Sequence, residues 1–453
     1  DAGGFGERAR RTNSDKIFAR LDWNISDRHQ LTLRHNFVDA YDDNLTRSSV
    51  NLRLANNGYV FNSTTNSTVL ELNSRLGAFS NNLILTASRI RDNREPEGAL
   101  FPSLEIRDGS RTILAGSERS SVYNELDQDV YELTDNLTRT FGDHTFTVGT
   151  HNEFFSFRNL FINNGYGRFE FGSLAAPTMG PNTSFADLRP SRVRATYSLD
   201  PTTPRPAAEF SAAQLGFYVQ DEYTPLPNLR LTLGLRLDVP VLPDAPARNQ
   251  AVDATFGDDY RTDNSPSGQL LWAPRLGFNW NPDNENKLQV RGGTGIFTGR
   301  VPFVWLSNNY INTGLTLGTI DVRPTAMAPL AFEPNPANFT TVYGGGIVAT
   351  REINLIGRDF KIPQVWRSNL AADYRLPGNL VLTVEGIYSK TLNDIYYRDL
   401  NLKAPVGKLA GPDERPVYAA APADRRVNPG FTNVLLLDNT SRGYRYSLTG
   451  QVQ

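Results

Sequence analysis

The chain has 453 residues, a formal net charge of −2 and no cysteine. The lack of cysteine excludes thiolate metal sites, thiol catalysis and a disulfide scaffold. The nearly balanced charge provides no general positive field for nucleic acid, so we expect no nucleic-acid partner. No run of about 18 apolar residues occurs, so the sequence predicts no transmembrane helix.

Apolar and polar residues alternate with the period of a β-strand in pairs of neighbouring segments. The clearest segment is 229–238, which has leucine at every odd position and a polar residue or glycine at every even one. Turns rich in Gly, Pro, Asn and Asp join the segments of each pair. The pairs are 17–24 with 31–37, 70–76 with a return strand from Leu83, 130–141 with 145–155, 215–223 with 229–238, 276–280 with 288–290, and 370–374 with 380–384.

The connections between the pairs differ sharply from the turns within them. They run to roughly 30 to 70 residues, far longer than connections in compact domains. A regular alternation of short turns and very long loops is typical of an outer-membrane barrel and not of a soluble sandwich. We therefore predict an all-β fold, a transmembrane antiparallel β-barrel with short periplasmic turns and long extracellular loops. Trp23, Tyr223, Trp280 and Tyr374 lie near strand ends, as interfacial aromatic residues do.

The sequence further predicts that residues 1–453 are an internal part of a longer barrel. The chain begins Asp-Ala-Gly-Gly, without an initiator methionine or a signal peptide, and residues 444–453 still alternate. In lipid every strand needs paired neighbours. About a dozen visible strands in a partial chain indicate a larger, plugged barrel of the class near 22 strands.

Several segments resemble TonB-dependent receptors. They include Phe217 to Tyr223, Gly234 to Asp238 and Ala273 to Phe278. Others resemble the Oar-like branch of that family, whose members carry a carboxypeptidase-regulatory-like domain at the N-terminus. These are Ser14 to Trp23, Thr65 to Ser67 before Glu71-Leu72, Glu132 to Asn136, Gly149 to Phe155 and Arg291 to Gly295.

The resemblance implies an outer-membrane transporter that captures an unidentified ligand and admits it when TonB supplies energy. Its implied partners are outer-membrane lipid and lipopolysaccharide, the TonB complex and accessory surface proteins. The plug, the TonB box and the N-terminal regulatory-like domain are not visible in this chain. Surface adhesion or protein secretion without active import is an alternative, and a soluble β-rich carbohydrate-binding protein or hydrolase is a weaker one.

Charged residues that alternate with the lipid-facing positions are predicted to face the lumen. The arginines can pair with nearby acids or hold a plug through charge-assisted hydrogen bonds. Wall-to-plug pairing is favoured over a substrate pathway as their role. The candidates are Arg20, Asp22, Glu71, Arg75, Arg230, Arg236, Asp238, Arg275, Asp373 and Arg375.

No catalytic constellation or cofactor motif is apparent, so we expect no enzyme. Gly292 to Gly295 lacks the Gly-Lys-Ser/Thr of a phosphate loop, and the spacing of His29, His35, His144 and His151 fits no zinc motif. No serine lies in a nucleophile elbow. The acidic loop segments Asp39/Asp42/Asp43 and Asp258/Asp259/Asp263 have the oxygen ligands that calcium prefers, but neither matches an EF-hand. A solvated loop is the preferred interpretation, and calcium is the alternative.

Overall fold

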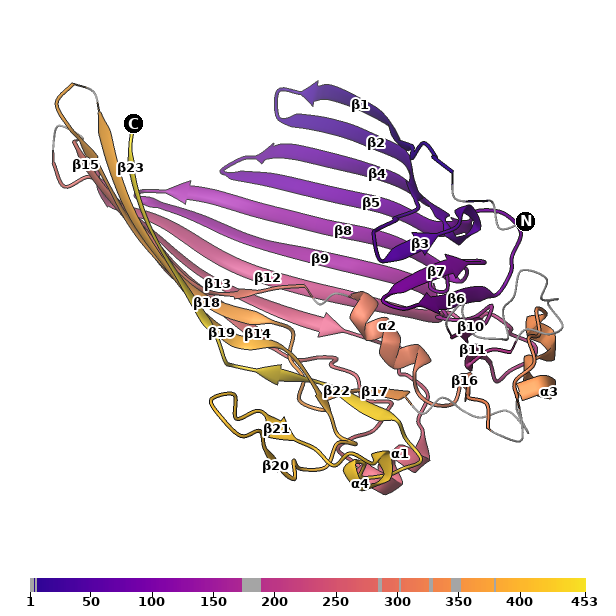
Figure 1. Cartoon of the computed structure of the whole chain (residues 1–453). Coiled ribbons are helices and arrows are strands. Elements are labelled where there is room, and N and C mark those ends of the chain that lie inside the picture. The colour runs from indigo at the N-terminus through magenta and orange to yellow at the C-terminus, as the bar shows by residue number, and fades with distance from the viewer. Residues whose placement is uncertain are drawn as a thin grey trace.

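One large curved sheet, here called the wall, dominates the molecule (Figure 1). The structure is a computed structural model that describes residues 4, 6–172, 189–283, 287–300, 303–325, 329–343, 352–378 and 380–453. The fifteen-stranded sheet follows the order β1-β2-β4-β5-β8-β9-β12-β13-β14-β15-β18-β19, after which β19 pairs with both β22 and β23, and β22 with β17. The pairing is antiparallel except between β17 and β22.

The six predicted strand pairs are confirmed as antiparallel hairpins. They are β1 (Thr12–Ser26) with β2 (His29–Asn44), β4 (Tyr59–Leu76) with β5 (Phe79–Pro96), β8 (Asn124–Phe141) with β9 (His144–Phe161), β12 (Ala208–Leu226) with β13 (Leu229–Val241), β14 (Leu271–Trp280) with β15 (Leu288–Thr298), and β18 (Gln364–Arg375) with β19 (Val381–Asp399).

Two turns are tighter than the sequence predicted. The return strand β5 begins at Phe79 instead of Leu83, and β12 continues to Leu226. Gly77 at φ +65° and Gly142 at φ +55° take the positive φ that glycine adopts readily at the first position of a two-residue hairpin turn. Asn284 and Asn379, in two further predicted turns, lie outside the described residues.

Strands β22 (Asn433–Thr440) and β23 (Tyr444–Val452) follow one another along the same edge of β19. Among the described residues, β1 has β2 as its one strand partner and β23 has β19, so β1 and β23 are free edges of an open sheet. In Figure 1 the short turns and the C-terminus lie at one end of the wall, and the long connections lie at the other.

The wall has an apolar face, here called the outer face. Leu21, Leu33, Leu70, Leu85 and Leu133 are successive cross-strand partners from β1 to β8. On β13, Leu233 and Leu235 are exposed whereas Asp238, on the opposite face, is 2% exposed. The alternation in 229–238 thus separates a hydrocarbon stripe from a polar stripe that is buried at its Asp238 end.

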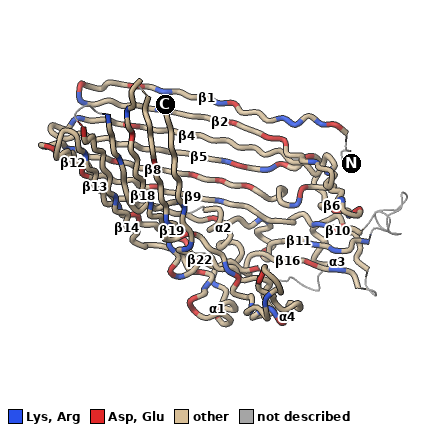
Figure 2. Tube along the Cα trace, turned by 60° about the vertical axis from the view of Figure 1, so that its left-hand side comes forward, with Lys and Arg blue, Asp and Glu red and all other residues tan. Residues whose placement is uncertain are grey.

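The apolar band of the outer face ends differently at its two sides. Towards the short turns, Tyr223 stacks on His144 with ring centroids 4.3 Å apart. Towards the long loops, register aligns a row of polar and charged residues, Asp15, Asp39, Thr64, Arg91, Asp127, Arg158 and Glu209. Within this row the Arg158 Nη1 lies 3.7 Å from Asp127 Oδ2. Figure 2 shows charges of both signs spread along the wall strands.

The long connections at this end of the wall, here together called the crown, contain regular structure although only loops were predicted. A six-stranded sheet, here called the crown sheet, has the order β16-β11-β10-β6-β7-β3. Its strands are β3 (Asn51–Arg53), β6 (Ser103–Asp108), β7 (Arg111–Ala115), β10 (Arg168–Phe171), β11 (Arg192–Ser198) and β16 (Leu317–Val322). Phe169, Phe171, Val193 and Ile320 form its buried core.

Helices are few and short. They are α1 (Gln250–Phe256), α2 (Phe303–Ile311), α3 (Phe339–Tyr343) and α4 (Pro422–Arg425), with single 3-10 turns at Ala55–Asn57 and Pro336–Asn338. The remaining strands are β17 (Glu352–Ile356) and the small hairpin β20 (Gly407–Lys408) with β21 (Pro416–Val417). Within the described residues, none of these helices has the length and apolar character needed to cross a bilayer.

Candidate ligand pathway and its crown

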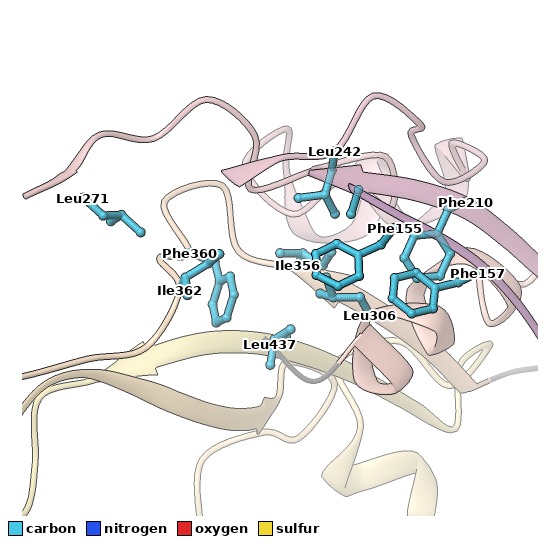
Figure 3. Packing of buried hydrophobic residues seen from close by; sticks show 11 residues of the cluster. Phe155, Phe157, Phe210, Leu242, Leu271, Leu306, Ile356, Phe360, Ile362 and Leu437 are labelled. Atoms are coloured by element: carbon cyan, nitrogen blue, oxygen red, sulfur yellow. The ribbon is translucent and has the colours of Figure 1, made fainter. Parts of the chain in front are cut away.

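The face of the wall opposite the leucines, here called the inner face, is covered by α2 at the long-loop end. Phe155 and Phe157 of β9 and Phe210 of β12 lie on this face and pack with Leu306 of α2 and with Ile356 (Figure 3). The Phe157 and Phe303 rings are 4.6 Å apart. Because side chains alternate along a strand, every residue in register with these phenylalanines belongs to the inner face.

Register places all ten lumen candidates on the inner face. Asp22, Glu71 and Asp238 belong to a single cross-strand row that also contains Thr134 and His151. The others follow by alternation: Arg20, Arg75, Arg230, Arg236, Arg275, Asp373 and Arg375. That this face lines a lumen, with these residues along a pathway or against a plug, stays a prediction.

The four acids of this set are all paired with arginines. Arg20 Nε lies 2.8 Å from Asp22 Oδ2, and Arg236 Nη2 lies 2.7 Å from Asp238 Oδ1. Glu71 and Asp373 instead pair with arginines outside the predicted set, Arg34 at 3.2 Å and Arg291 at 3.0 Å. Arg275 lies over the Phe297 ring at 4.7 Å. Two of the four acids thus pair with arginines of the predicted set, and the other two pair with arginines outside it.

A row of amides crosses the inner face nearer the short turns. Asn24, Gln30, Asn73, Asn82 and Asn136 are successive cross-strand partners. Asn82 Nδ2 donates to Asn73 Oδ1 at 2.9 Å and to Glu71 Oε1 at 3.2 Å. The row lines a cavity of about 580 Å³ together with Arg75. The inner face thus offers hydrogen-bonding groups over its whole height.

The sequence did not predict an ionic cluster around the buried Glu153 of the inner face. Glu153 is 2% exposed and lies opposite Glu132 on the neighbouring strand. Arg300, from the connection after β15, reaches Glu153 Oε2 with its Nε at 3.1 Å and Glu132 Oε1 with its Nη2 at 3.7 Å. His151 Nε2 lies 3.5 Å from Glu153 Oε1. The alternation from Thr145 onwards could have identified His151 and Glu153, but nothing in the sequence identifies Arg300 as their partner.

The crown sheet carries an ionic face opposite its apolar core. Arg194 Nη2 lies 2.7 Å from Glu170 Oε1, and Arg168, which is largely buried, contacts both Glu105 and Glu170. At the edge, Arg192 Nε donates to Asp321 Oδ1 at 2.6 Å. This hydrogen bond holds the pKa of Asp321 below its ordinary value. The strands are thereby joined by charge as well as by backbone hydrogen bonds.

The calcium candidates do not converge on one point. Asp258 lies 3.6 Å from Arg248, Asp259 lies 3.3 Å from Arg358, and Asp263 accepts from Arg261 Nε at 2.8 Å. The Arg261 hydrogen bond also lowers the pKa of Asp263. In the part of the chain that the structure describes, no three His, Asp or Glu residues gather as a metal would require. Calcium remains a prediction of the sequence alone.

Solved structures with the same architecture are outer-membrane proteins. The transporter YddB from Escherichia coli has a TM-score of 0.56 and 10% identity, over 98% of this chain and 45% of that one. The ferric enterobactin receptor PfeA from Pseudomonas aeruginosa, in a mutant form, has a TM-score of 0.51 and 14% identity, over 99% and 50%. The siderophore receptor PirA from the same organism has a TM-score of 0.50 and 12% identity, over 97% and 53%.

The chain therefore spans about half the length of the solved structures that it resembles. At these identities the likeness concerns the fold, and no curated protein sequence matches the chain. A family profile described as "Outer membrane beta barrel domain" matches residues 4–453. The chain thus belongs to the outer-membrane β-barrel domain family, and its place is the bacterial outer membrane.

Proposed function

We propose that the chain forms wall and extracellular crown of a TonB-dependent transporter of the Oar-like branch. The complete protein would carry a plug and an N-terminal regulatory-like domain, in a barrel of about 22 strands. The crown captures a ligand outside the cell, and the TonB complex supplies the energy that admits it. The protein acts by binding and passage and not as an enzyme.

The covered inner face carries this proposal. It is lined with paired charges and amides along its height, while the connection between β15 and β18 folds onto it through α2 and Arg300. A polar interior beneath a crown of inward-folded loops suits ligand capture followed by passage. On the outer face, leucines lie between aromatic residues near the short turns and a charged row near the long loops. This arrangement suits contact with lipid and lipopolysaccharide.

The test uses the full-length protein reconstituted in liposomes. Binding to the purified periplasmic domain of TonB is measured by surface plasmon resonance, and passive permeability is measured as swelling in arabinose. We expect saturable TonB binding and little swelling, because a plugged barrel does not pass solute without energy.

A swelling barrel that does not bind TonB would contradict the transporter proposal and favour a passive or secretory channel. A barrel that neither binds TonB nor swells would favour the alternative of surface adhesion.

A further inference from the structure

The crown contains a cavity of about 530 Å³. Its lining includes none of the ten lumen candidates, none of the amide row and no member of the Arg300 cluster. It lies where α2, the ends of β9 and β19, and strands β11, β16, β17 and β22 meet. This volume falls within the range of small-molecule binding sites, about 300 to 1,000 Å³. Its walls come from segments distant in the sequence, so the cavity is a product of the folded crown.

The two faces of α2 explain how the cavity forms. Phe303, Leu306 and Tyr310 follow helical spacing on one side and pack on the wall. Trp305 and Asn308 occupy the opposite side and line the cavity together with Asn312, the residue after the helix. The apolar side fixes the helix to the wall, and the opposite side, with its tryptophan and amide, remains available to a ligand.

The lining combines amides with aromatic rings. Trp305 is 42% exposed and Tyr397 36% exposed, and their rings meet edge to face with centroids 6.1 Å apart. Asn308, Asn312 and Asn354 lie around them. An amide offers a donor and an acceptor side by side, and an aromatic ring offers a flat apolar surface.

Two of the lining amides have unsatisfied oxygens. Asn354 is 5% exposed, and its Oδ1 has no hydrogen-bond partner among the described residues. The same holds for Asn164 Oδ1, whose residue has the unusual φ of +58°. A buried acceptor without a partner is unfavourable, so a ligand that donates hydrogen bonds would gain from this site.

The charge of the lining argues against an anionic ligand. Among the described residues around the cavity there is no arginine or lysine, and Glu352 is the one charged residue. Carboxylate and phosphate ligands are held by arginine and lysine. The amides and aromatic rings of the lining therefore suit a ligand without negative charge that is rich in hydroxyl groups and apolar on one face.

We propose that this cavity binds a neutral oligosaccharide, with a sugar ring stacked on Trp305, Tyr397 beside it, and its hydroxyls bonded to Asn308, Asn312 and Asn354. Vicinal hydroxyls match the paired donor and acceptor of an amide, and the C–H face of a pyranose matches an aromatic ring. This inference rests on the proposed function in one respect, since it names the class of ligand that the crown captures.

The test measures binding by isothermal titration calorimetry with the full-length protein in detergent and without TonB. The probes are maltohexaose, cellohexaose and xylohexaose, compared with ferric enterobactin, inorganic phosphate and an uncharged Ala-Gly hexapeptide. We expect one or more of the hexasaccharides to bind and the other probes not to bind.

Variants of α2 locate the site. Trp305→Ala should raise the Kd for the sugar at least tenfold, Asn308→Ala should raise it severalfold, and Trp305→Phe should restore most of the affinity. Val304→Ala is the matched control, because Val304 is the adjacent exposed residue on α2 and does not line the cavity. It should leave the Kd unchanged.

Binding of ferric enterobactin or the peptide without any hexasaccharide, no binding by any probe, or sugar binding that is unaffected by Trp305→Ala, would overturn the inference. Sugar uptake by cells with and without TonB then separates the two proposals. A sugar that binds but enters both cell types equally leaves the site valid and refutes energised import.

Discussion

At the residue scale, Arg300 joins a long connection to two carboxylates of the inner face. Glu132 and Glu153 are directly opposite each other on β8 and β9, an arrangement of like charges that destabilises a strand pair. Arg300 is a cation in contact with both carboxylates. It therefore stabilises the wall and, because it comes from a loop, fixes that loop to the wall.

We expect Arg300→Gln to loosen α2, which begins three residues later. Loss of a fully buried pair costs about 3–5 kcal/mol. Arg300 is 58% exposed, so local opening should become easier by ~1–2 kcal/mol. Hydrogen exchange of residues 303–311 should accelerate about tenfold, while exchange in the middle of β8 should not change.

Arg358→Gln provides the matched control for this prediction. Arg358 lies in the same connection and pairs with Asp259, but both side chains are about three-quarters exposed. Exposed pairs of this kind contribute little to stability. Equal exchange rates in α2 for the two variants would refute the role assigned to Arg300.

At the element scale, the crown sheet is built from strands that are individually too short to be stable. Its longest strand, β11, has 7 residues, and its shortest, β3, has 3. An isolated pair of such strands is marginal in water. The apolar core around Phe169 and the ionic face around Arg168 together hold the strands in place.

We expect the crown sheet to lose stability at acidic pH through Asp321. The hydrogen bond from Arg192 lowers the pKa of Asp321 in the folded state. Its stabilising contribution is thus present above the unfolded pKa of about 3.9 and is lost as the pH falls through the folded pKa. In Asp321→Asn this part of the pH dependence should be absent.

Thermal unfolding of the crown, followed by near-ultraviolet circular dichroism between pH 3 and 7, tests this expectation. The wild type should be more stable than Asp321→Asn at pH 7, and the difference should shrink as the pH falls towards 3. Asp258→Asn, which changes a carboxylate that is 88% exposed, should follow the wild type. A gap between wild type and Asp321→Asn that is as large at pH 3 as at pH 7 would contradict the assigned cause.

The elements differ in how far the sequence predicts them, and the reason is the range of their interactions. The hairpins are local: segment 229–238 alternates strictly, and its partner lies across a two-residue turn. Crown strands pair over long separations, as Arg192 does with Asp321, 129 residues away. Segments such as 168–171 are too short for alternation to be recognised.

The same limit applies to the site residues. Acids and arginines on regular strands, such as Asp22 and Arg236, could be assigned to one face from alternation alone. Arg300 and Trp305 could not, because their positions depend on how a long connection folds onto the wall. The cavity, whose lining ranges from Phe161 to Leu435, has no signature in any single segment.

At the scale of the whole molecule, the outer face defines where lipid meets the protein. On β5, Phe79 lies next to the short turn and is followed on the same face by Leu83 and Leu85, and then by Arg89 and Arg91. A spanning strand needs about 9–11 residues in the hydrocarbon. The stretch between Phe79 and Arg89 meets this requirement, which places Leu85 near the middle of the bilayer.

We therefore expect Leu85→Arg to destabilise the assembled barrel by about 2–4 kcal/mol, the cost of an arginine at the bilayer midplane. The matched control is Thr86→Arg, one residue further along β5. Thr86 faces inwards and lies opposite Glu132, so an arginine there enters a polar environment with an acid at hand. Folding into lipid vesicles under urea titration, with the full-length protein, should separate the two variants. If Thr86→Arg is the more damaging substitution, the leucines do not face lipid and the inner and outer faces are reversed.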